Sequence, residues 1–225
     1  MKRLLVHVEG QTEEAFVNGL LASHLYGFDY GQVRARLVGN ARNRIRRGGI
    51  SDWNVVRKDI DRHLRGDSGA LATTMVDYYA LPSGWPGRLP PANLTVPGKS
   101  SHIHQKLSED FDAFSAASQR FHPYVMMHEF EALLFSDCLT FAEAIGYDDR
   151  AEALQAVRDQ FHDPEHINDS PQTAPSKRVA RIVPGYDKVL FGNVAALEIG
   201  LARIRAECPS FNDWVTFLEN WPAPT

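Results

Sequence analysis

Acidic residues follow short apolar runs at three separate places in this chain. They are Glu9 after residues 4–8, Asp77 after residues 70–76, and Glu129 with Glu131 after residues 123–127. Short apolar runs rich in β-branched residues predict buried strands, and the carboxyl ends of parallel strands lie along one edge of a sheet, where ligands bind. Carboxylates that lie close together need a cation or a shared proton. Because oxygen ligands without cysteine favour Mg²⁺ or Mn²⁺ over zinc, the sequence predicts such an ion at this edge.

The segment 9–14, Glu-Gly-Gln-Thr-Glu-Glu, joins the first predicted strand to an amphipathic helix. A carboxylate at the tip of a buried strand is costly unless a positive group meets it, so we expect Glu9 to bind the metal. Thr12 is the expected N-cap of the helix, and Glu13 and Glu14 in its first turn suit the positive end of the helix dipole. A purely structural role therefore stays open for Glu13 and Glu14.

Glu129 and Glu131 open the third strand-to-helix junction and are separated by one residue. Side chains two positions apart on a helix diverge, so we expect only one of the pair to face the site. The alternative is that one of them caps the helix while the other is solvated. The expected catalytic acids are Glu9, Asp77, Glu129 and Glu131.

Arginine is concentrated between residues 34 and 47, although the chain as a whole has a net charge of −4. This span contains Arg34, Arg36, Arg42, Arg44, Arg46 and Arg47, with no acid among them. The planar guanidinium binds phosphate oxygens in pairs, which favours a nucleic-acid backbone as partner. The side chains expected to contact phosphate are Arg42, Arg44, Arg46, Arg47, Lys177 and Lys188. The alternative is a solvated loop and helix face.

The length and composition are those of an ordinary globular protein. The 225 residues are enough for one sizeable core. No apolar run is long enough to cross a bilayer, and the charges at Glu9, Glu13 and Glu14 interrupt the apolar run that follows the basic N-terminus. Cys138 and Cys208 belong to no close-spaced ligand pattern, which argues against a thiolate zinc site. We therefore expect a cytoplasmic protein with no membrane partner.

The periodicity of apolar residues indicates the elements that position these side chains. Residues 33–38 alternate and predict a strand, and residues 53–64 predict an amphipathic helix. Residues 81–101 are rich in proline and glycine, which predicts a long loop beside Asp77 that acts as an active-site flap. Trp85 within this loop either packs or stacks on a base. Further helices are expected at 104–121, 141–145, 151–161, 194–206 and 211–221.

The pattern of the chain changes after residue 137. Residues 1–137 combine predicted strands and helices, whereas residues 138–225 predict helices only. The expected fold is therefore α/β, with a mostly parallel sheet flanked by helices and a helical C-terminal region packed on it.

Several of these motifs resemble known families. The acidic segment that begins at Glu9, the acid at Asp77 and the acidic third junction are similar to the Toprim fold of topoisomerases, bacterial primases and overcoming-lysogenization-defect nucleases, over roughly residues 1–137. More narrowly, TTMVDYYALP at 73–82, HEFEALLF at 128–135 and TAPSKR at 173–178 resemble a bacterial family catalogued as domain of unknown function 4276. This second resemblance spans nearly the whole chain.

The Toprim resemblance implies metal-dependent phosphoryl-transfer chemistry. It implies that Glu9 acts as an acid/base or metal ligand, and Glu13 matches a second acid of the nucleases. The Asp-x-Asp metal motif is matched only by Asp77, because Tyr79 stands at its second position and cannot hold Mg²⁺ as a carboxylate does. An acid of the third junction would supply the missing oxygen, or the site would hold one metal or none. The implied metal ligands are Glu9, Glu13, Asp77 and Glu131.

Two functions from different classes are consistent with these residues. The first is a Mg²⁺-dependent nuclease that cleaves DNA or RNA, and the resemblance links it to bacterial anti-phage systems that include an ATPase. The second is a non-catalytic Toprim-like subunit that binds an ATPase or nucleic acid, which Tyr79 favours. A small phosphoester hydrolase that uses the same carboxylates is a third possibility. The sequence leaves the oligomeric state open.

Overall fold

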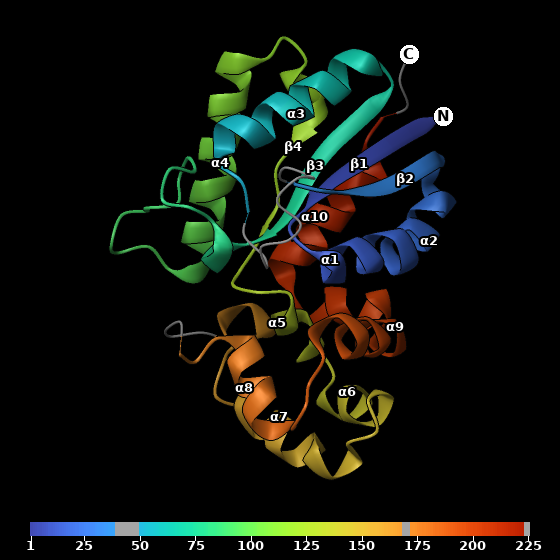
Figure 1. Cartoon of the computed structure of the whole chain (residues 1–225), viewed down its shortest axis with the longest axis vertical. Helices are drawn as coiled ribbons and strands as arrows, with labels where there is room; N and C mark the ends of the chain where they lie inside the picture. The colour runs from blue at the N-terminus through green and yellow to red at the C-terminus, as the bar shows by residue number, and fades with distance from the viewer. Residues whose placement is uncertain (39–49, 168–171, 223–225) are drawn as a thin grey trace.

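The core of the molecule is a parallel sheet between two layers of helices (Figure 1). The computed structural model describes residues 1–38, 50–167 and 172–222. The strands within these residues are β1 (Lys2–Val8), β2 (Tyr30–Leu37), β3 (Ala70–Asp77), β4 (Phe121–His122) and β5 (Val125–Met126). Their order is β2-β1-β3-β4, and β5 pairs in parallel with the carboxyl end of β3. The predicted α/β fold with a mostly parallel sheet is confirmed.

Helices follow the strands and fill the C-terminal part of the chain. They are α1 (Gln11–Phe16), α2 (Ala22–Leu25), α3 (Trp53–Gly66), α4 (Val96–Phe114), α5 (Glu131–Leu134), α6 (Cys138–Ala144), α7 (Ala151–Arg158), α8 (Pro175–Ile182), α9 (Lys188–Glu207) and α10 (Pro209–Asn220). A short 3-10 helix, η7 (Pro164–His166), lies between α7 and α8. None of the helices in the described ranges is both long and apolar enough to serve as a membrane span.

The two faces of the sheet bury separate apolar clusters. Leu4, Val6 and Val8 of β1 point to one face, where they pack with α1 and α10. Alternate positions of β3, such as Ala72 and Val76, pack on the other face with α3 and α4. Because side chains alternate along a strand, His7 lies on the opposite side of β1 from Val6 and Val8.

Helix α10, near the C-terminal end of the chain, packs on the sheet. Helix α10 lies behind the strands in Figure 1, and its Trp214 Nε1 donates a hydrogen bond to Thr73 Oγ1 of β3 at 2.9 Å. Lys2 Nζ at the start of β1 donates to the carbonyl oxygen of Trp221 at 2.7 Å. Helices α6 to α8 form the lower part of the molecule in the same view. One apolar cluster therefore joins residues on both sides of position 137.

The proline- and glycine-rich segment is shorter than the sequence predicts. Helix α4 begins at Val96, within the expected loop 81–101, because Pro97 is tolerated in a first helical turn and Thr95 Oγ1 accepts a hydrogen bond from the Gly98 N–H at 3.4 Å. Trp85 is buried, lies 4.9 Å from the Trp53 ring, and donates to the Ser51 carbonyl. Trp85 therefore packs in the core and is not free to stack on a base.

The start of the first helix also differs from the prediction. The N-cap is Gly10, two residues before the expected Thr12, and α1 begins at Gln11. The cap interaction comes from Glu13, whose Oε2 accepts a hydrogen bond from the Gly10 N–H at 3.0 Å. A carboxylate three residues into the helix thus replaces the hydroxyl cap that the sequence suggested.

Candidate active site

Acids from separate parts of the sequence meet around one lysine at the carboxyl edge of the sheet. Asp77 is the last residue of β3, Glu131 the first of α5 and Lys188 the first of α9. Lys188 Nζ lies 3.6 Å from Asp77 Oδ2 and 3.0 Å from Glu131 Oε2. Glu9, just after β1, is electrostatically coupled to Lys188 and to Glu13. We call Glu9, Glu13, Asp77 and Glu131, with Lys188, the acidic cluster.

The position of Lys188 depends on how α9 packs. Asp187 caps this helix, since its Oδ1 accepts a hydrogen bond from the Leu190 N–H at 2.9 Å. One turn after Lys188, Gly192 faces Thr12 of α1, and a Cβ at this position would lie 3.5 Å from the Thr12 methyl and 3.2 Å from the Tyr186 hydroxyl. The missing side chain therefore lets α9 approach α1 closely, which brings Lys188 to the sheet edge.

Burial raises the pKa values of the acids in the cluster. Glu131 has no exposed surface and Asp77 is 6% exposed, and desolvation raises the pKa of each carboxyl while the Lys188 ammonium opposes this rise. Burial, followed by the charge of Glu13, raises the pKa of Glu9 to about 7. The two ion pairs in turn raise the pKa of Lys188 although burial lowers it. Four carboxyl groups therefore share one ammonium, and burial favours the neutral form of Glu9, Asp77 and Glu131.

Three oxygen atoms of this region have neither a hydrogen-bond nor an ion-pair partner among the described residues. They are Glu9 Oε2, Glu131 Oε1 and the Tyr186 hydroxyl, all of them buried. Buried polar atoms in folded proteins nearly always have a partner, so an unpartnered set implies a missing ligand, ion or water. Carboxylate oxygens are the ligands that Mg²⁺ and Mn²⁺ prefer, and the donors present here fit such an ion.

The other two predicted acids are partly engaged in helix capping. Glu129 Oε2 accepts a hydrogen bond from the Ser176 N–H in the first turn of α8 at 2.9 Å, and Glu13 caps α1 as described above. Asp77 Oδ1 similarly accepts from the Phe130 N–H at 3.0 Å. Only Glu131 of the pair at the third junction lies against Lys188, as the two-residue spacing predicted. The charge of Glu129 still raises the pKa of Glu131.

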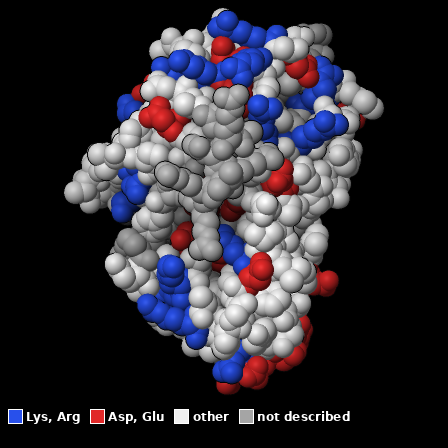
Figure 2. Space-filling model, viewed as in Figure 1, with Lys and Arg blue, Asp and Glu red and all other residues white. Residues whose placement is uncertain are grey.

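The basic residues expected to bind phosphate fall into three groups. Arg42, Arg44, Arg46 and Arg47 lie outside the described residues. Lys177 is exposed on α8. Lys188 lies within the acidic cluster, and its pairing was not apparent in the sequence because its partners are more than 50 residues away. Figure 2 shows acidic and basic side chains side by side in the middle of this face, below a concentration of basic side chains over α3 and β2.

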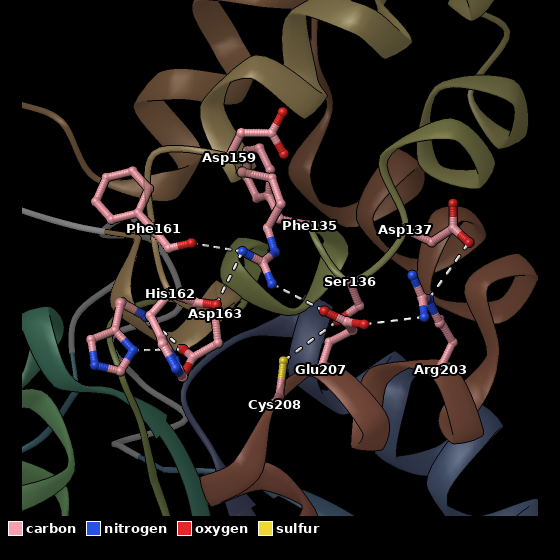
Figure 3. Close-up of polar contacts among 12 residues, drawn as sticks. Phe135, Ser136, Asp137, Asp159, Phe161, His162, Asp163, Arg203, Glu207 and Cys208 are labelled. Carbon is pink, nitrogen blue, oxygen red and sulfur yellow. Dashed lines mark hydrogen bonds and ion pairs between the residues drawn. The ribbon is translucent and has the colours of Figure 1, made fainter.

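Two cavities lie away from the acidic cluster. A cavity of about 450 Å³ between α4 and α10 is lined in part by His104, Glu165 and Trp214. A smaller one of about 230 Å³ is lined in part by Arg203 and Glu207. Glu207 is fully paired there, since Arg158 and Arg203 contact its two oxygens at 3.0 and 3.1 Å (Figure 3). Neither cavity is lined by an acid of the cluster. The predicted site residues Glu9, Asp77 and Glu131 lie at the edge of the sheet instead.

Comparison with known proteins places the chain in a family. No curated protein and no solved structure shows significant similarity to it. One family model, described as Domain of unknown function (DUF4276), matches residues 8–219, a range that includes every residue of the acidic cluster. Because this match covers nearly the whole chain, the protein belongs to the DUF4276 family.

Proposed function

We propose that the protein is a divalent-metal-dependent nuclease that hydrolyses phosphodiester bonds at the acidic cluster. The observation that carries this proposal is the convergence of buried, incompletely partnered carboxylates at the carboxyl ends of parallel strands. Burying several carboxylates together lowers the stability of a protein. Such clusters, with shifted pKa values, are found most often at functional sites. The resemblance of the motifs at Glu9 and Asp77 to Toprim enzymes adds support for phosphoryl transfer.

The ligands for the metal would be Glu9, Asp77 and Glu131, with Glu13 close to them. Each has at least one carboxylate oxygen in the region, and Glu9 and Glu131 each have an oxygen without a partner among the described residues. A bound Mg²⁺ or Mn²⁺ would activate water and offset the charge that develops on the scissile phosphate. Tyr79, in place of a second aspartate, favours one ion over two.

Glu9 is suited to accept a proton from the attacking water. In the metal-free protein, burial together with the Glu13 charge raises the pKa of Glu9 to about 7, near the working pH that suits a general base, so Glu9 would act as the base where it is not itself a metal ligand. Lys188 has two roles in this proposal. It holds Asp77 and Glu131 in place through its ion pairs, and its positive charge attracts the phosphate group of the substrate.

The nucleic-acid backbone would be held by the arginine-rich segment and by Lys177. Contacts of this kind position the substrate through its phosphates and carry no sequence information. Each phosphate contact that is lost should reduce the slope of log affinity against log salt concentration by about 0.9 for duplex DNA. Replacement of Arg42, Arg44, Arg46 and Arg47 by Gln therefore measures how many of them contact the backbone.

The test of catalysis compares three variants in the presence of Mn²⁺. Glu9→Gln and Asp77→Asn remove a charge while keeping side-chain size, and each should lower the cleavage rate by about 100-fold or more. Glu14→Gln serves as the matched control. Glu14 lies beside Glu13 in the first turn of α1 and is not part of the acidic cluster, so this variant should cleave normally. Circular dichroism confirms that all three are folded. Cleavage at the wild-type rate by both Glu9→Gln and Asp77→Asn would contradict the proposal.

The substrate class is tested with plasmid DNA, single-stranded RNA, transfer RNA and a phosphomonoester. A nuclease should cleave at least one of the polymers and leave the monoester intact. Cleavage of the monoester alone would instead indicate a small phosphoester hydrolase.

A second candidate function is favoured by the ion pairs of Lys188. Because its ammonium already contacts Asp77 and Glu131, the cluster is partly neutralised without a metal, and Tyr79 is a poor ligand. In this alternative the protein is a non-catalytic subunit that binds an ATPase or nucleic acid. Calorimetric titration separates the two functions, since the nuclease should show saturable Mn²⁺ binding that Asp77→Asn removes, whereas the non-catalytic subunit should show none.

A further inference from the structure

A second polar cluster lies on the face of β1 opposite Leu4, Val6 and Val8. It consists of His7 in β1, with Asp59 and His63 one turn apart on α3, and one potential ligand atom of each lies within 4.8 Å of the others. The i,i+4 spacing of Asp59 and His63 places both on the same face of the helix. His7 is fully buried, whereas the other two are half-buried.

The hydrogen bonds of His7 fix the orientation of its ring. His7 Nδ1 lies 3.3 Å from the Thr73 carbonyl oxygen, which can only accept, so Nδ1 carries the proton. His7 Nε2 is therefore unprotonated and accepts a hydrogen bond from His63 Nδ1 at 3.3 Å, which a metal ion between the two nitrogens would replace. A histidine whose one nitrogen donates to a carbonyl while the other is unprotonated is the arrangement found in metal-binding histidines.

The distance between the two facing nitrogens also fits a metal ion. Two nitrogens that are each about 2.0–2.1 Å from a tetrahedral Zn²⁺ are separated by about 3.3 Å. The distance from His7 Nε2 to His63 Nδ1 has this value. A small movement of Asp59 would add a carboxylate oxygen, which gives two nitrogen ligands and one oxygen ligand with a fourth position for water.

Asp59 is held by arginine rather than left free. Its oxygens accept hydrogen bonds from Arg36 at 2.9 and 3.2 Å and from Arg62 at 3.3 Å. A carboxylate oxygen has two lone pairs, so these bonds leave acceptor capacity for a metal, and outer partners of this kind orient ligating carboxylates. The charge of Arg36 opposes a cation at the site, and the negative charge of Asp59 offsets this repulsion.

We propose that His7, Asp59 and His63 form a binding site for a transition-metal ion of the Zn²⁺ class, which links β1 to α3. Imidazole nitrogens favour Zn²⁺ over Mg²⁺, whereas the all-oxygen acidic cluster has the opposite preference. The two sites are thus chemically separate even though His7 lies two residues before Glu9. A metal bound here would stabilise the strand that positions Glu9.

Another group of possible metal ligands has no fully buried histidine and does not link a strand to a helix, and it provides the control. His162, Asp163 and His166 lie within one short segment, and the two histidine Nδ1 atoms lie 3.1 and 2.7 Å from the Asp163 oxygens. Figure 3 shows His162 and Asp163 next to each other. The His162 side chain is 86% exposed, and the group joins no strand to a helix.

The experiment uses full-length protein without a histidine tag, stripped of metal by a chelator. Wild-type protein should bind about one equivalent of Co²⁺ with a visible absorption band, and Zn²⁺ should displace it. His63→Gln, a change at a half-buried helix position, should weaken Zn²⁺ binding by about 100-fold or more. Asp59→Asn should weaken it as well. Binding of Zn²⁺ should raise the melting temperature of wild-type protein and leave that of His63→Gln unchanged.

Two further variants locate the effect. His166→Gln removes a histidine from the control group and should bind Zn²⁺ like wild-type protein. Glu9→Gln should also keep Zn²⁺ binding, so failure of this site and failure of the nuclease proposal are distinguishable. The proposal is overturned if wild-type protein binds no Co²⁺ or Zn²⁺, if His63→Gln binds as tightly as wild type, or if His166→Gln abolishes binding.

Discussion

Glu131 and Glu165 are both buried glutamates, yet their surroundings differ. Glu165 is 6% exposed, and its two oxygens accept hydrogen bonds from the Ser210 and Phe211 N–H groups at 2.8 and 3.0 Å. It caps the first turn of α10 from η7. Glu131 has no exposed surface, its Oε2 lies 3.0 Å from Lys188 Nζ, and its Oε1 has no hydrogen-bond partner within the described part of the chain.

The pKa shifts do not separate these two acids. Burial raises the pKa of Glu165 to about 7 and also raises that of Glu131 above its usual value. The difference lies in the partners, because a carboxylate with both oxygens satisfied by a helix N-terminus has a structural role. A buried carboxylate with an unused oxygen is available to a ligand. Three predictions test this comparison.

The first prediction concerns the cation that Glu131 shares with Asp77. Lys188→Met leaves two buried carboxylates without their positive partner, which costs about 3–5 kcal/mol in a fully buried pair. Because 40% of the Lys188 side chain is exposed, we expect a loss of about 2 kcal/mol in unfolding free energy. The loss should be larger near pH 8 than near pH 5, since carboxyls with raised pKa values are protonated at the lower pH. Urea denaturation at both pH values measures it.

Lys177→Met is the control for this variant. Lys177 is exposed on α8, so its replacement should change the unfolding free energy by less than about 0.5 kcal/mol at either pH. Equal effects of the two lysine variants would show that the ion pairs of Lys188 do not stabilise the sheet edge.

The second prediction compares the two glutamates directly. Glu165→Ala leaves two N–H groups of α10 without a partner and should lower the unfolding free energy by about 1–2 kcal/mol. Glu131→Gln removes a buried charge, keeps the side-chain size and leaves Lys188 paired with Asp77, so we expect a change below about 1 kcal/mol. The nuclease proposal adds that Glu131→Gln abolishes Mn²⁺-dependent cleavage while Glu165→Ala keeps it. If both variants lose the same stability and neither affects cleavage, the two acids are alike.

The third prediction follows from the pKa of Glu9. A folded-state pKa of about 7, raised from the ordinary glutamate value of 4.5, means that the folded protein holds more protons than the unfolded chain between these pH values. The contribution of Glu9 to stability therefore falls as pH rises through this window in the absence of metal. Relative to wild type, Glu9→Gln should become more stable at about pH 8 than at about pH 5, by roughly 1 kcal/mol or less after allowance for solvent screening. Denaturation in the presence of a chelator checks the sign. No pH-dependent difference would mean a solvated carboxyl, and the opposite trend would mean that nearby positive charge stabilises the ionised form of Glu9.

Local sequence patterns were enough to predict the long strands, most of the helices and the acids at the strand ends. Around residues 123–127, however, the structure has two short strands, β4 and β5, rather than the one strand expected. Apolar runs of period two and amphipathic runs of helical period predicted β1, β3 and α3 because local backbone geometry decides which side chains share a face. It also followed from the sequence that acids after parallel strands lie at one edge. Local rules failed where two competing signals were close, as at Gly10 and Thr12 or at the start of α4.

The partners of charged side chains such as Lys188 depend on packing between segments that are distant in the sequence. Lys188 meets Asp77 and Glu131 across intervals of 111 and 57 residues because α9 packs against α1 and α5, and no local pattern encodes such a contact. His7 likewise meets His63 only because α3 covers that side of β1. Secondary structure depends on neighbours in sequence, whereas the electrostatics of a buried site depends on groups that packing brings together from distant segments.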